Sequence, residues 1–320
     1  MKICLVGPGI QPIPPTGWGA VEILIHDLRV SLEKLGHEVK IVNLKNMDLA
    51  AALVNHFNPD FVHIQYDEHI DIAKKLICKN VGVSSHFGYL ENKAKWGGYY
   101  YRIFSKIATS NVHVFCSSKG IQDVYLDACV PQERLSVLPN GTRTDLFTFN
   151  EECKQPKDSI YLAKVEERKK QYLYQDIEGL YFAGRIVDDK FKKDNPRHLG
   201  EFSKKELYKN LTNFANLVLL SDGEAHPLVC TEAMASGLGV IVSEPAAANL
   251  NLDLPFIDLI PNDKLKDIEY VTNVINKNKE VSVKLRKEIR KYAVEEFDWL
   301  HVAGNIYIKQ IEEIIERNKS

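Results

Sequence analysis

The segment LVLLSDGEAHPLVCTEAMASG, residues 217–237, decides the class of fold. Its first apolar residues are typical of a buried strand, a polar loop follows, and Pro227 suits the first turn of a helix that Gly237 ends. Strands that lead through short loops into helices build parallel sheets covered by helices. Glu224 falls in the loop and Glu232 inside the predicted helix, eight positions further on.

The start of this helix is a candidate anion site. Backbone N–H groups from Leu228 onward have no partner within the first turn, and the helix dipole favours negative charge there. We therefore predict a diphosphate site at Pro227 and Leu228, flanked by Glu224. The alternative is a buried helix that carries one capping acid and one solvated acid.

The alternation of strand and helix continues toward the N-terminus. Lys2–Gly7 is a short apolar run that ends in glycine, and apolar residues recur at helical steps over Ala20–Leu35 until Gly36. Further strands are predicted at His37–Val42, Phe61–Gln65, Val81–His86, Val112–Ser117 and Leu135–Pro139. Helices are predicted around Leu49–Phe57, Asp71–Cys78, Tyr99–Thr109 and Gly120–Ala128.

The pattern restarts after a break. Asn140 and Gly141 form a turn signal, and Thr144–Ser159 lacks a clear period, so we predict a linker there. Strands follow at Ile160–Ala163, Leu180–Ala183, Leu217–Leu220, Val240–Ser243 and Phe256–Ile260. Two Rossmann-like halves in tandem would place a ligand cleft between them, at the carboxyl ends of their strands. Leu300–Glu316 has one long helical pattern with no strand after it.

Composition excludes several classes of protein. A chain of 320 residues suits about two domains. The formal charge of -2 provides no general attraction to nucleic acid, and no apolar run reaches the roughly 20 residues that span a membrane. The six cysteines form no CxxC pair, which favours a reducing compartment, and the chain begins with a strand in place of a secretory signal. We therefore expect a cytoplasmic location.

Glycines near the N-terminus suggest a second phosphate contact. Gly7 and Gly9 follow the first strand, but Pro12 breaks the GxGxxG fingerprint, which disfavours a nicotinamide-dependent dehydrogenase. Gly17 and Gly19 stand just before the first helix, where small residues let backbone N–H groups approach a ligand. A proline-rich loop that needs turn residues is the alternative.

Two side chains at strand ends, His86 and Lys164, are candidates for chemistry, whereas a third polar residue, His63, is not. His86 ends a strand and could bind a sugar hydroxyl or position an acceptor, although such histidines are also often structural donors. His63 lies inside an apolar strand and is predicted to be a satisfied core histidine. Lys164 follows the strand Ile160–Ala163 and could neutralise a phosphate leaving group, while the rest of its charge run suits a solvated face.

Taken in order, these motifs resemble the retaining glycosyltransferases of family four, which have the GT-B fold. The carboxylate pair matches that family's E-x7-E motif, and the resemblance covers nearly the whole chain. The segments that carry it are Gly17–Glu22, His86–Gly88, Asn140–Gly141, Lys164–Gln171, His198–Glu201 and Glu224–Gly237.

The resemblance implies a role for each residue. Glu224 would contact the donor sugar and Glu232 the ribose hydroxyls, while Lys164 and Lys169 would hold the diphosphate. Pro227 and Leu228 would lie at the same nucleotide site. Glu224 and Lys169 would thus be catalytic residues of the second domain.

The resemblance also implies roles in the first domain. Gly17 and Gly19 would border the phosphates, and His86 would be a catalytic residue near the reacting sugar. The final helix would cross back onto the first domain, as in other GT-B proteins. The predicted domains are an acceptor-side domain over 1–150 with the helix 300–320, and a nucleotide-sugar domain over 151–299.

The implied activity is that of a hexosyltransferase. A sugar would move from a nucleotide-diphosphate sugar, with a UDP- or GDP-sugar favoured, to an acceptor hydroxyl with retention of configuration. Cations and helix N–H groups would stabilise the departing diphosphate in place of a metal or other cofactor. Asp188 and Asp189 are adjacent, unlike the spaced acids of an Asp-x-Asp metal site, and are read as a solvated turn.

The acceptor stays open: a glycan, a lipid-linked molecule or a small molecule. The segment Lys93–Lys106 mixes aromatic and basic residues, so it could contact a glycan or, peripherally, a membrane surface. A core helix whose tyrosines line the cleft is the favoured interpretation. Two other functions also stay open: a sugar-nucleotide epimerase with the GT-B fold, and a catalytically impaired module that binds the nucleotide sugar.

Overall fold

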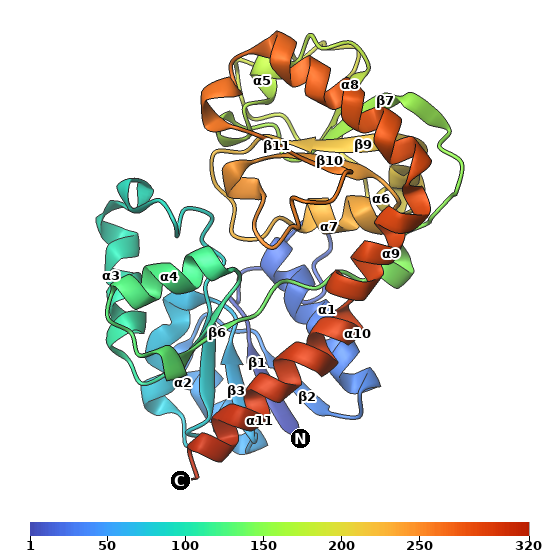
Figure 1. The fold of residues 1–320 in the computed structure, drawn as a ribbon. Helices are drawn as coiled ribbons and strands as arrows, with labels where there is room; N and C mark the ends of the chain where they lie inside the picture. The colour runs from blue at the N-terminus through green and yellow to red at the C-terminus, as the bar shows by residue number, and fades with distance from the viewer. Residues whose placement is uncertain (320) are drawn as a thin grey trace. The chain divides into compact units, whose positions relative to one another are not determined.

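A computed structural model of the chain describes residues 1–319 and divides them into two compact units, each with its own sheet. The N-terminal unit comprises Met1–Gly141 with residues 299–319, and the C-terminal unit comprises Thr142–Asp298 (Figure 1). The chain thus leaves the first unit nine residues before the predicted boundary at 150. Residue 320 of the predicted final helix lies outside the described residues.

The N-terminal unit is built on a parallel sheet of six strands in the order β2-β1-β3-β4-β5-β6. Apolar side chains make the central strands almost completely buried, as parallel sheets covered on both faces require. The strands are β1 Lys2–Val6, β2 Glu38–Val42, β3 Phe61–Ile64, β4 Val81–Ser84, β5 His113–Cys116 and β6 Leu135–Val137.

Helices lie on both sides of this sheet (Figure 1). Helix α3 buries Tyr100, Ile103, Phe104 and Ile107, so its apolar face belongs to the core, as the favoured interpretation of Lys93–Lys106 expected. Its other two tyrosines, Tyr99 and Tyr101, are exposed, and the expectation that the tyrosines line the cleft stays a prediction. The helices are α1 Ala20–Lys34, α2 Met47–Phe57, α3 Gly97–Thr109, α4 Lys119–Asp127, α10 Trp299–His301 and α11 Ile308–Arg317, with a π-helix at Val302–Tyr307 between the last two.

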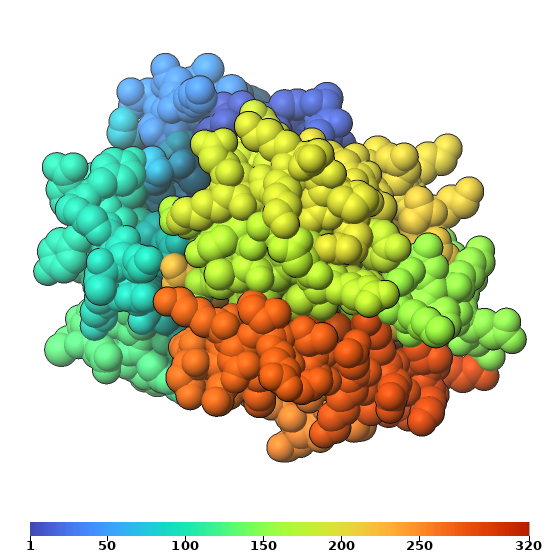
Figure 2. All heavy atoms as spheres, turned by 90° about the horizontal axis from the view of Figure 1, so that it is seen from above, coloured from blue at the N-terminus to red at the C-terminus, as the bar shows by residue number. Residues whose placement is uncertain are grey.

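The C-terminal unit has a parallel five-stranded sheet in the order β11-β10-β9-β7-β8. Helix α8 packs against β7, β9 and β10, and on the face seen in Figure 2 its orange surface adjoins the yellow-green surface of residues near 170–210. The strands are β7 Gln155–Leu162, β8 Leu180–Ala183, β9 Phe214–Leu219, β10 Gly239–Ser243 and β11 Ile257–Ile260. The helices are α5 Gln171–Tyr174, α6 Lys204–Asn210, α7 Leu228–Ala235, α8 Ile268–Lys284 and α9 Arg286–Phe297.

The two sheets share one topology. Within each unit the strands, counted along the chain, lie in the order 2-1-3-4-5, extended by a sixth strand in the N-terminal unit. In such open sheets, ligands bind beyond the carboxyl ends of the two neighbouring strands at which the strand order reverses. Those strands are β1 and β3 in the first unit, and β7 and β9 in the second.

Two predicted segments have different structures. Part of the predicted linker belongs to strand β7, which starts at Gln155. The sequence did not reveal this start because the first three residues of the strand are exposed and lack the apolar pattern of a buried strand. The predicted helix Asp71–Cys78 is a 3-10 helix over Asp67–Lys75. It begins earlier because hydrogen bonds from Ser85 and Tyr100 fix the buried Asp67 carboxylate at its start.

Candidate active site

The loops after β7 and β9 meet beyond the sheet of the C-terminal unit. The backbone N–H of Asp222, after β9, donates to the carbonyl of Arg168, after β7, at 2.9 Å. The buried Tyr161 hydroxyl donates to the Lys169 carbonyl at 2.5 Å and accepts from the Leu220 N–H at 2.8 Å. One phenol therefore fixes both loops at the strand ends where this topology binds ligands.

The side chains of Lys169 and Glu224 are brought together at this point. The Lys169 ammonium bonds to Oε1 of Glu224, and only about a tenth of each side chain is exposed (10% and 12%). Arg168 adds a second cation: its guanidinium lies 3.4 Å from the same oxygen and donates to the Gly223 carbonyl. The structure thus assembles two cations around one carboxylate.

Burial and charge act in opposite directions on these groups. Burial lowers the pKa of Lys169, and the adjacent Glu224 carboxylate partly restores it. Glu166 accepts from Arg168 at 2.9 Å; burial would raise the pKa of this carboxyl, but Arg168 and Lys164 hold it below its usual value. Three cations and two carboxylates leave this cluster with one positive charge, which suits an anionic ligand.

Arg168 is the functional candidate that the sequence analysis missed. It lies in the charged run Glu166–Lys170, in which no sequence pattern distinguishes a buried cation from a solvated one. A short 3-10 turn over Glu167–Lys169 and a left-handed backbone at Lys170, with φ of 56°, turn Arg168 and Lys169 toward Glu224.

Lys164 has a different environment from Lys169. Its side chain is 54% exposed and pairs with Glu166 at 3.2 Å. The backbone beside it is fixed, because the buried Gln171 amide donates to the Lys164 carbonyl at 3.0 Å. Lys164 therefore lies at the rim of the cation cluster, and its predicted contact with a diphosphate stays a prediction.

Helix α7 carries the rest of the predicted nucleotide site. Pro227 is its N-cap, one position before the predicted first turn, and Leu228 is its first residue. Glu224 lies in the loop and the partly buried Glu232 on the second turn, as predicted. Gly237 ends the helix with φ of 84°, in the left-handed region that favours glycine.

The glycine pair of the N-terminal unit lies where the sequence placed it. Gly19 is the N-cap of α1 with an extended backbone, and a side chain there would meet the Glu22 carboxylate at 2.6 Å. Gly17 is exposed, and a Cβ at this position would have nothing within 4 Å of it. A side chain at Gly19 would thus have to displace the Glu22 carboxylate, whereas one at Gly17 would meet nothing.

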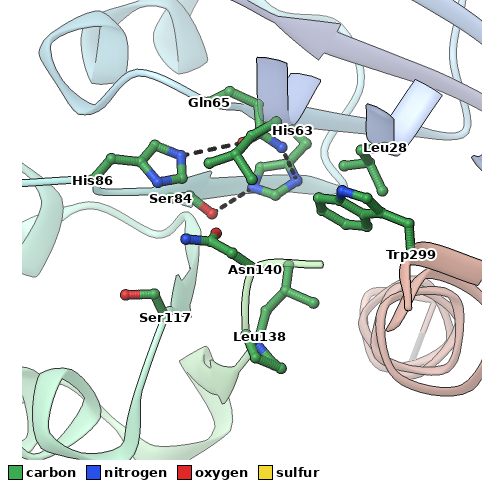
Figure 3. A pocket seen from close by; sticks show the side chains of 11 residues that line it. Leu28, His63, Gln65, Ser84, His86, Ser117, Leu138, Asn140 and Trp299 are labelled. Carbon is green, nitrogen blue, oxygen red and sulfur yellow. Dashed lines mark hydrogen bonds between the residues drawn. The ribbon is translucent and has the colours of Figure 1, made fainter. Parts of the chain in front are cut away.

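His86 lies two residues beyond β4, at the carboxyl edge of the N-terminal sheet. Burial lowers the pKa of His86 to about 4, so the ring is neutral at pH 7. It borders a cavity of about 20 Å³, roughly the room for one water molecule. As Figure 3 shows, the cavity lies among polar groups from β3, β4 and the segment after β6, with Trp299 beside them.

His63 is the core histidine that the sequence predicted. It is fully buried, and both ring nitrogens have partners: Nδ1 lies 2.8 Å from the Tyr307 hydroxyl and Nε2 lies 2.9 Å from Ser84 Oγ. The sequence did not predict that a buried carboxyl, Asp67, follows the same strand. Asp67 accepts from Ser85 at 2.5 Å, and its burial raises its pKa.

Neither a metal site nor a membrane-spanning helix is found in the described residues. Within residues 1–319, histidine, cysteine and acidic side chains form no group of three or more that could hold a metal ion. Of the predicted solvated turn, Asp189 is exposed, but Asp188 is buried, and its carboxylate accepts from the Lys190 N–H. No helix in the described part of the chain combines the length and apolar character needed to cross a bilayer.

The amino-acid sequence matches no protein-family model and no curated protein. Solved structures match it over nearly its whole length. Sucrose-phosphate synthase from Thermosynechococcus elongatus aligns with a TM-score of 0.76 at 15% identity, covering 97% of this chain and 99% of that one.

Two further structures align over 99% of this chain and 100% of their own. HepE from Anabaena, in complex with UDP-glucose, has a TM-score of 0.71 at 13% identity. WaaB, a lipopolysaccharide outer core galactosyltransferase, has a TM-score of 0.66 at 16% identity. The chain therefore has the GT-B fold of these glycosyltransferases, which confirms the predicted fold class.

Proposed function

We propose that the protein is a retaining glycosyltransferase that moves a hexose from a nucleotide-diphosphate sugar to an acceptor hydroxyl without a metal ion. The observation that carries this proposal is the cluster of Arg168, Lys169 and Glu224 beyond β7 and β9. It combines a net positive charge with a carboxylate at the ligand-binding edge of a sheet. The GT-B fold and the UDP-glucose bound to HepE support a nucleotide sugar, with a UDP-sugar as the first candidate.

The charges of the reaction explain the proposed roles in the C-terminal unit. Breaking the anomeric C–O bond leaves negative charge on the diphosphate, which Lys169, Arg168 and Lys164 would stabilise together with the first N–H groups of α7. Glu224 would contact the donor sugar and Glu232 the ribose hydroxyls.

The N-terminal unit would supply the remaining contacts. Gly17 and Gly19 would border the phosphates, and His86 would lie near the reacting sugar. The acceptor hydroxyl would attack the face that the diphosphate leaves, with the leaving phosphate accepting the hydroxyl proton. The acceptor is a glycan, a lipid-linked molecule or a small molecule, and both the cytoplasmic location and a peripheral membrane contact stay predictions.

Thermal unfolding in the presence of UDP-, GDP-, ADP- and dTDP-sugars tests the proposal, because a ligand bound to the native state raises Tm. We expect one class of donor to raise Tm and to be hydrolysed slowly without an acceptor. Lys169→Ala and Glu224→Ala should each reduce donor turnover by about 100-fold, as the loss of a preorganised charge at a reacting centre does.

Lys192→Ala is the matched control. Lys192 forms an exposed ion pair with Asp176 at 2.8 Å, so this variant removes the same charge from the same unit while donor turnover is retained. Donor binding without hydrolysis or transfer would indicate a binding module, and isomerised donor in the absence of an acceptor would indicate an epimerase. If no nucleotide sugar raised Tm, the proposed function would be wrong.

A further inference from the structure

Gln65 connects the two histidines at the carboxyl edge of the N-terminal sheet. Its Nε2 lies 3.0 Å from Nδ1 of His63, and its Oε1 lies 3.4 Å from Nε2 of His86 (Figure 3). Gln65 is buried, with 4% exposed, and the adjoining cavity has room for only about one water molecule, so the two rings are the main partners of its amide. The orientation of that amide therefore depends on the proton positions of the two rings.

The Gln65 amide nitrogen faces His63 and determines which nitrogen of that ring carries the hydrogen. Burial lowers the pKa of His63 well below the usual value, so its ring is neutral and carries a single N–H. Of the two neighbours of Nδ1, the Gln65 amide nitrogen can only donate a hydrogen bond, whereas the Tyr307 hydroxyl can donate or accept. Nδ1 is therefore the acceptor, and Nε2–H donates to Ser84 Oγ.

The same reasoning extends to His86. With its NH2 group directed at His63, the Gln65 amide presents its oxygen to Nε2 of His86. An amide oxygen only accepts, so this ring nitrogen carries the hydrogen. Nδ1 of the neutral His86 ring then keeps its lone pair and accepts hydrogen bonds.

We propose that Gln65, whose amide nitrogen faces His63, is a positioning residue that holds His86 as the Nε2–H tautomer and leaves Nδ1 to accept a hydrogen bond from a sugar hydroxyl. The tautomer follows from contacts within the N-terminal unit, whereas the hydroxyl partner rests on the proposed function. Gln65 does not itself touch the sugar. It acts by fixing the ring orientation and the acceptor atom of His86, as hydrogen-bonded neighbours do for other functional histidines.

Nitrogen NMR of histidine-labelled protein tests the tautomer directly, because protonated and unprotonated ring nitrogens have well-separated 15N shifts. The His63 and His86 resonances are assigned with His63→Gln and His86→Gln. We expect Nε2 to be protonated and Nδ1 unprotonated in both rings of the wild-type protein. A proton on Nδ1 of His86 would overturn the proposal without the need for any Gln65 variant.

Gln65→Leu removes both ends of the amide at nearly constant volume. We expect the His86 nitrogen shifts to move toward the average of the two tautomers, while those of Gln122→Leu match the wild type. Gln122 is the matched control because it is a glutamine of similar burial (6% exposed) on α4, where it accepts from Lys119. Unchanged His86 shifts in folded Gln65→Leu would also overturn the proposal.

Measurements of donor turnover test the role of Gln65 separately from the proposed function. Once a donor is known, Gln65→Leu should lower kcat by about 10-fold with little change in the KM for the donor, since Lys169 and Glu224 are untouched. A loss confined to KM would contradict a positioning role. If the predicted tautomer is found but no nucleotide sugar is turned over by the wild type, the proposed function fails while the role of Gln65 in fixing the tautomer stands.

Discussion

The ammonium of Lys169 is bonded to the carboxylate of Glu224, and protein covers about nine-tenths of both side chains. Removing either side chain leaves the other as a buried charge that has lost its hydration and its ion-pair partner, which is energetically unfavourable. We expect Lys169→Met and Glu224→Gln each to lower the free energy of unfolding by about 1–3 kcal/mol, and the double variant to cost less than their sum. Urea denaturation of the four proteins measures the coupling, and strictly additive effects would contradict it.

The Tyr161 hydroxyl provides a second stability test. Tyr161→Phe leaves the Lys169 carbonyl and the Leu220 N–H without their partner in a buried site, which should cost about 2–3 kcal/mol. It should also loosen both loops, so that a nucleotide sugar that binds the wild type binds this variant more weakly. Tyr181→Phe, on the partly exposed Tyr181 of β8, is the control and should change both quantities little.

Lys170 occupies a backbone conformation that suits glycine. Its φ of 56° is left-handed, and a side chain there costs roughly 1 kcal/mol relative to glycine. Lys170→Gly should therefore raise the free energy of unfolding or leave it unchanged, despite the greater flexibility of the unfolded chain. Lys157→Gly, in the extended strand β7, should lower it by about 0.5–1 kcal/mol. Equal losses from the two variants would contradict the argument.

Gly141 lies against the indole of Trp299. A methyl group at Gly141 would approach ring atom Cδ2 to 2.3 Å, so Gly141→Ala must displace a buried tryptophan. We expect a loss of about 1–3 kcal/mol by denaturation, as overpacking of a core usually produces. Gly98→Ala, where nothing lies within 4 Å of the added methyl, should be neutral or stabilising because it lies within helix α3.

Buried histidines predict how stability depends on pH. Burial lowers the pKa of His86 and His226 to about 4 and, with help from Arg317 and Arg134, that of His113 to about 3. Unfolded histidines titrate near pH 6.5, so as pH falls from about 6.5 toward 4 the unfolded chain binds more protons than the native one, and stability decreases.

The expected loss between pH 7 and pH 5 is about 1–2 kcal/mol for each buried histidine. Urea denaturation at the two values measures it. His113→Gln should reduce the difference by the contribution of one histidine, and equal stability at both values would show that the native protein binds these protons after all.

Some features could be predicted from the sequence because they depend on local patterns. Apolar runs that end in glycine or polar residues located the strands, and Pro227 and Gly237 marked a helix that leaves Glu224 in the preceding loop and includes Glu232. The same logic identified His63 as a core residue, since it stands among apolar neighbours in β3.

Other features depend on contacts that no local pattern records. Arg168 faces Glu224 because a 3-10 turn and one left-handed residue redirect a run of charges, and that geometry is invisible in the sequence Glu-Glu-Arg-Lys-Lys. Gln65 lies between two histidines only because β3 and β4 are adjacent in the sheet. Helices α8 and α9 were not predicted, and the polar start of β7 was mistaken for a linker.

The π-helix Val302–Tyr307 sets the phase of the last helix. Its wider turns take up one residue more than α-helical turns would, directly before the isoleucines of α11 that face the core, Ile308, Ile311 and Ile314. If the same residues formed α-helical turns instead, everything after them would be rotated by about 100° and shifted by about 1.5 Å. The isoleucine stripe would then turn toward solvent, and the Tyr307 hydroxyl would no longer reach His63. The extra residue taken up by these wider turns thus keeps the end of the chain connected to His63 in strand β3.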